Sequence, residues 1–247
     1  MFWSRGSLKI MMAAVAVLAA MLLLATDCRA DRRSYVWTYE YQTMLKGRFE
    51  FEYYLTEEQK YIEKAKPNIW KNWFELEYGI TDRWDISMYQ MLKQSNTAKS
   101  DKFEYEGFKI RTRYRILEKN KLPVDTLLYL EYIMTPNAIN QNALEAKVVL
   151  AKDIGKFNIA YNQILKQELA TDVKTKNEYA AGFSYAVTPR FKIGCESKGS
   201  YTDDKYYIGP TISFAWPMKA FVTLGAAAGL TEKSDDLQTR LIVGFLF

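Results

Sequence analysis

The sequence predicts an all-β fold, an antiparallel transmembrane β-barrel of twelve strands that follows a cleaved N-terminal signal peptide. Apolar and polar residues alternate in a series of segments, and this period of two is typical of β-strands. After residue 30 no apolar run approaches the length of a spanning helix, so a mature chain that crosses a membrane must do so as a closed barrel. Between the segments, short connections alternate with others that are mostly longer.

The start of the chain has the pattern of an export signal. Two basic residues precede an apolar run over residues 10–25, and small residues at Cys28 and Ala30 predict a signal peptide over 1–30 that is cleaved after Ala30. A transmembrane anchor is the alternative, but the run is short for a span. Cleavage leaves 247 − 30 = 217 residues, enough for one domain, and Cys195 as the single cysteine, which excludes an intramolecular disulfide.

The strand pattern begins near residue 48 and continues to the end of the chain. In the first segment Phe49, Phe51 and Tyr53 alternate with Glu50 and Glu52, which places aromatic and charged side chains on opposite faces. The predicted strands are 48–56, 69–80, 83–93, 104–117, 124–135, 143–153, 156–168, 177–187, 190–201, 205–216, 219–230 and 237–247.

The connections predict how the barrel is oriented. Tight turns at 79–83, 153–156, 187–190 and 216–219 alternate with loops at 57–68, 94–103, 136–142, 169–176, 202–204 and 231–236. In bacterial outer-membrane barrels the short turns face the periplasm and the strand number is even. Aromatic residues beside the tight turns would form an interfacial girdle, and they are Trp84, Phe157, Phe191, Trp216, Phe221 and Phe247.

The last strand favours a membrane barrel over a soluble one. Leu241, Val243, Phe245 and Phe247 form an apolar face that ends on an aromatic residue. It resembles the terminal strand by which Gram-negative outer-membrane barrels are recognised for insertion. The resemblance implies that Phe245 and Phe247 are an assembly signal, and that outer-membrane lipid and the insertion machinery are partners. A secreted soluble β-protein is an alternative, because an ordinary core would give the same alternation.

Residues 31–46 do not fit the strand count. Tyr35, Trp37, Tyr39 and Tyr41 alternate with other residues as in a strand, but a thirteenth strand would place the amino terminus on the wrong side. We expect an ordered extension that tucks into the periplasmic mouth or pairs at the seam, with the barrel over 47–247. A fourteen-strand barrel remains an alternative.

Several turn and strand motifs resemble one family. They are Tyr35–Tyr41, Leu45–Gly47, Glu50, Glu77–Arg83, Glu145–Lys152, Val187–Phe191 and Ile208–Pro210. This set is similar to a group of uncharacterised Gram-negative outer-membrane barrels, which are distantly similar to the barrels encoded beside aromatic-degradation enzymes. The resemblance implies a barrel of this size and passage of a small polar or aromatic solute. The very short loop at 202–204 offers little material for an external lid.

The composition argues against catalysis. The chain contains no histidine, the usual general base and a frequent metal ligand. Carboxylate pairs such as Glu50 with Glu52 could serve a glycosidase, but such rows are also expected in a barrel lumen. We expect no enzymatic activity, no cofactor and no metal site. A net charge of +5 without a clustered basic stripe gives no indication of nucleic-acid binding.

Charged residues on the lumen face are the candidate contacts for a solute or an ion. They are Glu50, Glu52, Glu75, Glu77, Asp85, Lys109, Arg111, Arg113, Arg115 and Glu131. An acidic wall would then lie near a basic one. Two interpretations follow: a narrow channel or binding barrel that selects zwitterions or anions, or a closed structural barrel whose loops 57–68 and 94–103 contact a partner.

Overall fold

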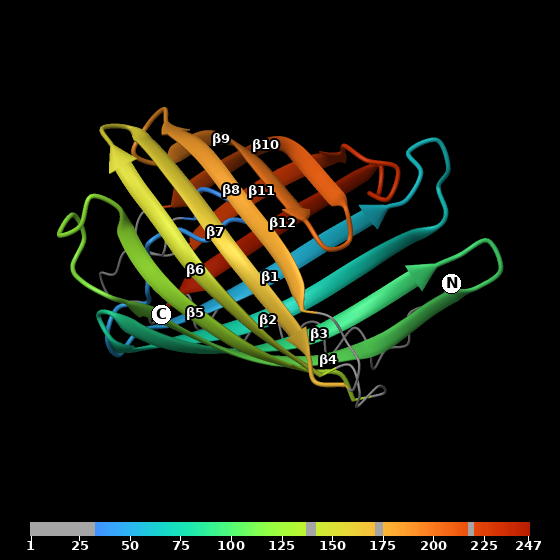
Figure 1. The fold of residues 1–247 in the computed structure, drawn as a ribbon, viewed down its shortest axis with the longest axis horizontal. Helices are drawn as coiled ribbons and strands as arrows, with labels where there is room; N and C mark the ends of the chain where they lie inside the picture. The colour runs from blue at the N-terminus through green and yellow to red at the C-terminus, as the bar shows by residue number, and fades with distance from the viewer. Residues whose placement is uncertain (1–32, 137–141, 171–174, 217–219) are drawn as a thin grey trace, which may run out of the picture.

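A computed structural model describes residues 33–136, 142–170, 175–216 and 220–247. Twelve strands form one closed antiparallel barrel, in which each strand pairs with its sequence neighbours and the last pairs with the first (Figure 1). The strands are β1 (Phe49–Gln59), β2 (Asn68–Thr81), β3 (Trp84–Asn96), β4 (Asp101–Arg115), β5 (Asp125–Met134), β6 (Ala143–Ile154), β7 (Phe157–Glu168), β8 (Lys176–Ala186), β9 (Phe191–Ser200), β10 (Lys205–Trp216), β11 (Ala220–Gly229) and β12 (Leu237–Leu246). The predicted signal peptide over 1–30 lies outside the described residues.

Each predicted strand corresponds to one strand of the barrel, so the predicted fold class and the number of twelve are confirmed. Among the described residues, no helix is long and apolar enough to cross a bilayer.

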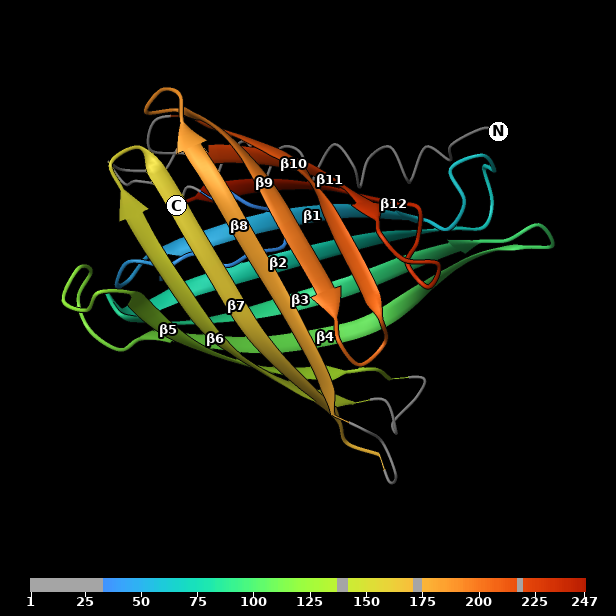
Figure 2. The same ribbon diagram turned by 45° about the horizontal axis from the view of Figure 1, so that its top comes forward.

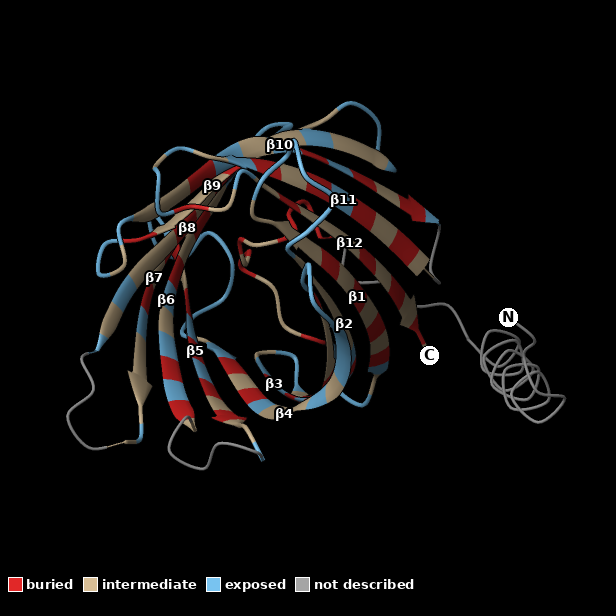
Figure 3. Cartoon of the chain, turned by 90° about the vertical axis from the view of Figure 1, so that its right-hand side faces the viewer, coloured by how far each residue is buried: buried red, intermediate tan, exposed pale blue. Residues whose placement is uncertain are grey.

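The burial of side chains is the inverse of that in a soluble barrel. Along β3, Ile86 and Met88 are exposed on the outside, whereas Asp85 and Tyr89 are buried inside. The same alternation appears as bands along the strands in Figure 3. An apolar outer face is stable in hydrocarbon and is the pattern of membrane barrels.

The two ends of the barrel differ. The turn end carries the turns at 82–83 and 155–156 and the C-terminal Phe247, and the loop end carries the loops 60–67 and 97–100. At the turn end Gly155 has a φ of +61°, which suits the two-residue connection between β6 and β7. One connection at this end, 116–124 between β4 and β5, is longer than the tight turns.

At the loop end, the strands continue further than the sequence pattern indicates. The predicted loop 94–103 is mostly strand, because β3 and β4 form a long hairpin that leaves only residues 97–100 as the loop. Figure 2 shows this hairpin extending beyond its neighbours. A cross-strand ion pair between Lys93 and Glu104, 3.0 Å long, lies in the extended part. Both faces of the hairpin carry polar residues here, so the sequence shows no alternation of apolar and polar residues.

The barrel closes between its first and last strands. The main-chain nitrogen of Phe49 donates to the oxygen of Phe247 over 3.1 Å, and the reverse bond is 3.0 Å long. Their rings are stacked, with centroids 6.0 Å apart and an interplanar angle of 8°. The C-terminal residue therefore takes part in closure.

Phe221 differs from the prediction. It was expected in the outer aromatic girdle, but it is fully buried on the inside of the barrel. Phe221 pairs with Gly244 on β12, and a Cβ atom at Gly244 would lie 2.1 Å from the phenylalanine ring. The missing side chain of this glycine leaves the room that the ring occupies.

Candidate functional site in the barrel lumen

Residues 33–46, which we name the inner segment, lie inside the barrel. They form no strand and pair with the wall through an isolated bridge between Lys46 and Gly79 at the turn end. Viewed from the loop end, a chain segment occupies the lumen (Figure 3). The segment rises from Lys46 to Trp37 and returns toward the turn end, where the main-chain oxygen of Arg33 accepts a bond of 2.5 Å from Ser213. Residues 33–46 thus reach beyond the mouth of the barrel at the turn end.

Glu196 on β9 binds the main chain of the inner segment where it reaches furthest toward the loop end. Its carboxylate accepts hydrogen bonds from three consecutive main-chain nitrogens, those of Val36, Trp37 and Thr38, over 2.7, 2.8 and 2.8 Å. Bonds from an N–H group to a charged carboxylate are stronger than those between neutral groups. Because Glu196 is buried, these bonds also satisfy a charge that would otherwise be costly in the lumen.

Two glycines provide space for the inner segment. A Cβ atom at Gly182 on β8 would lie 2.5 Å from the ring of Tyr35, and one at Gly225 on β11 would lie 2.4 Å from a methyl group of Val36. Real Cβ atoms do not approach so closely. The wall is therefore shaped to the side chains of this segment.

Paired charges line the wall formed by β2, β3 and β4. Arg111 lies 2.9 Å from Glu75 and 2.5 Å from Glu77, and Arg113 also contacts Glu77. Arg113 lies 2.8 Å from Asp85. All five side chains are buried. The acidic and basic residues that the sequence predicted for the lumen therefore neutralise each other along the wall.

The inner segment takes part in this network. Arg33 lies 2.9 Å from Glu52 on β1. The ring of Tyr39 lies within 6 Å of four cationic groups, which are Arg33, Arg111, Arg113 and Lys147. Cations at this distance from an aromatic face are attracted to it. The aromatic residues of the segment thus connect charges from separate strands.

The remaining predicted lumen residues fall into two groups. Lys109 and Glu131 form an ion pair of 3.1 Å, and Glu50 is buried. Arg115 differs, because its guanidinium bonds to the main-chain oxygen of Asp82 at the turn end, and among the described residues it has no carboxylate within 4.0 Å. Its position at the end of β4 places it at the rim.

A cavity of about 400 Å³ occupies the loop-end half of the lumen. Trp37 and Tyr39 of the inner segment are among its lining residues. Smaller cavities of about 50 and 10 Å³ lie against other residues of the segment, including Glu40 and Gln42. Arg33 and Tyr39 line both the largest and the smallest of these, so the inner segment forms a partition in the lumen.

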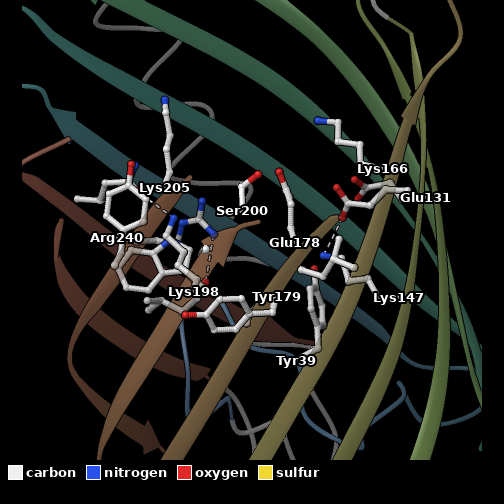
Figure 4. A pocket seen from close by; sticks show the side chains of 18 of the residues that line it. Tyr39, Glu131, Lys147, Lys166, Glu178, Tyr179, Lys198, Ser200, Lys205 and Arg240 are labelled. Carbon is white, nitrogen blue, oxygen red and sulfur yellow. Dashed lines mark hydrogen bonds and ion pairs between the residues drawn. The ribbon is translucent and has the colours of Figure 1, made fainter. Parts of the chain in front are cut away.

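Lys198 and Arg240 are among the cavity cations that the predicted lumen set does not include. Figure 4 shows Lys198 and Arg240 beside each other on one side of the cavity, with Glu131 and Lys147 on the other. Strand parity could have found them, because Lys198 alternates with outward Cys195 and Ile193, and Arg240 precedes Leu241 of the outer face. Parity alone does not tell which lumen cations lack a carboxylate.

Within the described part of the chain, no group of three or more Cys, Asp and Glu side chains is arranged to hold a metal ion. The one described cysteine, Cys195, is free and exposed.

Comparison with solved structures identifies the architecture. The KdgM porin superposes with a TM-score of 0.56 at 12% identity, covering 80% of this chain and 98% of the porin. KdgM in complex with disordered oligogalacturonate gives 0.56 at 11%, covering 80% and 98%, and the NanC porin gives 0.52 at 10%, covering 81% and 98%. The chain has the fold of an outer-membrane β-barrel. At these identities the likeness concerns the fold. No protein-family profile matches the sequence, and no curated protein matches it.

Proposed function

We propose that this protein is a non-enzymatic barrel of the bacterial outer membrane that takes small solutes into its loop-end cavity and passes them through a narrow path controlled by the inner segment. The division of the lumen into an open half and a half filled by residues 33–46 carries this proposal. Export through a signal peptide over 1–30, insertion by the barrel-assembly machinery and a barrel domain over 47–247 belong to the same proposal.

The cavity has the size and lining of a solute site. About 400 Å³ lies within the range of small-molecule pockets. Its wall combines aromatic rings, among them Trp37 and Trp73, with lysines, arginines and carboxylates. Such a lining can bind polar and zwitterionic solutes, and the predicted lumen charges Lys109 and Glu131 are part of it.

Passage to the turn end requires the inner segment to move. The bonds from Val36, Trp37 and Thr38 to Glu196 hold it near the middle of the barrel. Since the segment is attached to the wall by polar bonds and not by a strand ladder, weakening them should open the path without breaking the barrel.

Conductance in planar bilayers tests the proposal. The mature chain is expected to show small, infrequent openings, and Glu196→Gln should increase them, because an amide replaces the carboxylate that accepts three bonds. The matched control is Glu178→Gln, which changes a cavity carboxylate on β8. A mature chain that starts at Lys46 should insert and conduct steadily. Equal conductance in all four proteins would contradict control by the inner segment.

A closed structural barrel is the second candidate. The β3–β4 hairpin and loop 60–67 extend at the loop end and expose Phe103 and Ile62, at 63% and 66%. An ion pair of 2.5 Å between Lys66 and Asp101 connects the two loops. If neither the mature chain nor the variants conduct, this exposed surface and a partner for it become the better account.

A further inference from the structure

We propose that Lys198 and Arg240 form a binding site for a small oxyanion, such as a phosphate or carboxylate group, in the loop-end cavity. This inference deepens the proposed function, because it names the chemistry of the solute. Both side chains line the cavity and both are partly buried, so they contact its interior while the wall shields them from bulk water. Figure 4 shows them on the same side of the cavity.

The partners of these two cations are neutral. The ammonium group of Lys198 donates to the amide oxygen of Gln238 over 2.5 Å. Arg240 donates from Nε to the Thr56 hydroxyl over 2.8 Å and from Nη1 to the main-chain oxygen of Val36 over 3.1 Å. Within the described residues, neither cation has a carboxylate within 4.0 Å.

Three other cations of the cavity are neutralised, whereas Lys166 and Lys205 also have no carboxylate within 4.0 Å among the described residues. Lys109 lies 3.1 Å from Glu131, and Lys147 lies 2.8 Å from Glu145. Arg33 is paired with Glu52. An unpaired charge that is removed from water is costly, so the contrast with Lys198 and Arg240 indicates a place for an external counter-charge.

Three carboxylates of this part of the lumen already accept bonds from other groups. Glu58 forms an ion pair of 2.7 Å with Lys71, and Glu196 accepts its three main-chain bonds. Asp235 accepts from the amide of Gln238 over 3.0 Å. Among the described residues, none of these carboxylates lies within 4.0 Å of the Lys198 ammonium or the Arg240 guanidinium.

Aromatic rings fix the positions of the two cations. The ring of Trp37 lies 4.7 Å from the Lys198 nitrogen and 5.8 Å from the Arg240 guanidinium carbon. Trp73 lies 5.5 Å from Arg240, and Tyr207 lies 5.1 Å from Lys198. These contacts attract the cations but do not neutralise them. The guanidinium keeps Nη2 without a hydrogen bond to any described residue, and an ammonium has three donors, so both can bind an oxyanion.

Titration with inorganic phosphate tests the site. Tryptophan fluorescence of the purified mature protein in detergent is followed at constant ionic strength, with chloride replaced by phosphate. We expect a saturable change, because Trp37 and Trp73 contact the two cations. Lys198→Met should weaken phosphate binding at least tenfold. The control Lys233→Met removes an exposed lysine of a loop at the same end and should bind as the unchanged protein does. Acetate in place of phosphate distinguishes the source of the oxyanion.

A second measurement needs no ligand. In chloride, Lys198→Met should leave the urea midpoint unchanged or raise it, since it removes a charge that has no counter-ion, whereas Lys109→Met should lower it by stranding Glu131. The site is refuted if Lys198→Met binds phosphate as tightly as the unchanged protein, or if neither oxyanion gives a change beyond that of chloride. Binding without any conductance would retain this site and refute the channel alone.

Discussion

The side chain of Asn162 on β7 bonds to both main-chain groups of Tyr39. Its amide oxygen accepts from the Tyr39 nitrogen over 2.7 Å, and its amide nitrogen donates to the Tyr39 oxygen over 2.9 Å. The two residues are 123 positions apart in the sequence. A side-chain amide in this position replaces a strand partner for one residue of the inner segment, so the segment stays in the lumen without joining the sheet.

Asn162→Leu should loosen the inner segment. Leucine has a similar size but leaves the main-chain nitrogen and oxygen of Tyr39 unsatisfied, at a cost of roughly 1–3 kcal/mol for each group. Limited proteolysis of the folded protein should then cleave within residues 33–46 sooner. The control is Gln163→Leu, on the neighbouring outward position of the same strand. Equal cleavage of the two variants would contradict the role assigned to Asn162.

Arg111→Met should destabilise the barrel. The substitution leaves Glu75 and Glu77 without a cation that now contacts both in a fully buried position. Removing one partner of a buried ion pair costs about 3–5 kcal/mol. The urea midpoint should fall accordingly. Lys102→Met is the matched control: it breaks an ion pair with Glu104 on the exposed hairpin, where such pairs contribute about 0–1 kcal/mol. Similar midpoints for both variants would refute the network.

Phe247→Ser should reduce insertion into the outer membrane. The substitution removes the ring that stacks on Phe49 at the seam, and deletion of the residue would also remove both closing hydrogen bonds. A barrel that does not close exposes unpaired strand edges. The amount of heat-modifiable protein in outer-membrane fractions should fall. The control Phe183→Ser changes an exposed ring in the middle of β8. Normal insertion of Phe247→Ser would contradict an assembly signal at this position.

The sequence predicts the strands of the barrel better than the contacts between side chains in its lumen. Alternation reports which residues face outward, and this was sufficient for the number and order of the strands. Inside the lumen the same parity cannot distinguish Lys109, which has a carboxylate partner, from Lys198, which has none among the described residues. That difference depends on residues brought together from separate strands.

The position of the inner segment is the second feature that the sequence alone does not predict. Tyr35, Trp37 and Tyr39 alternate as in a strand, and the odd strand count was the only indication that they do something else. Several of their partners, among them Glu196 and Asn162, lie more than 120 positions away. Single wall residues that bind main-chain groups have no periodic signal in the sequence.

The position of the inner segment in the lumen is the central claim, and a disulfide tests it most directly. Val36→Cys and Gly225→Cys are introduced together with Cys195→Ser, because a Cβ atom at Gly225 would contact Val36. Pairing of Val36→Cys with Leu224→Cys, an outward position, is the control. We predict that the first pair forms a disulfide on oxidation, with a fall in bilayer conductance that a reductant reverses, and that the control pair stays reduced. Free thiols at both positions of the first pair after oxidation would contradict the account.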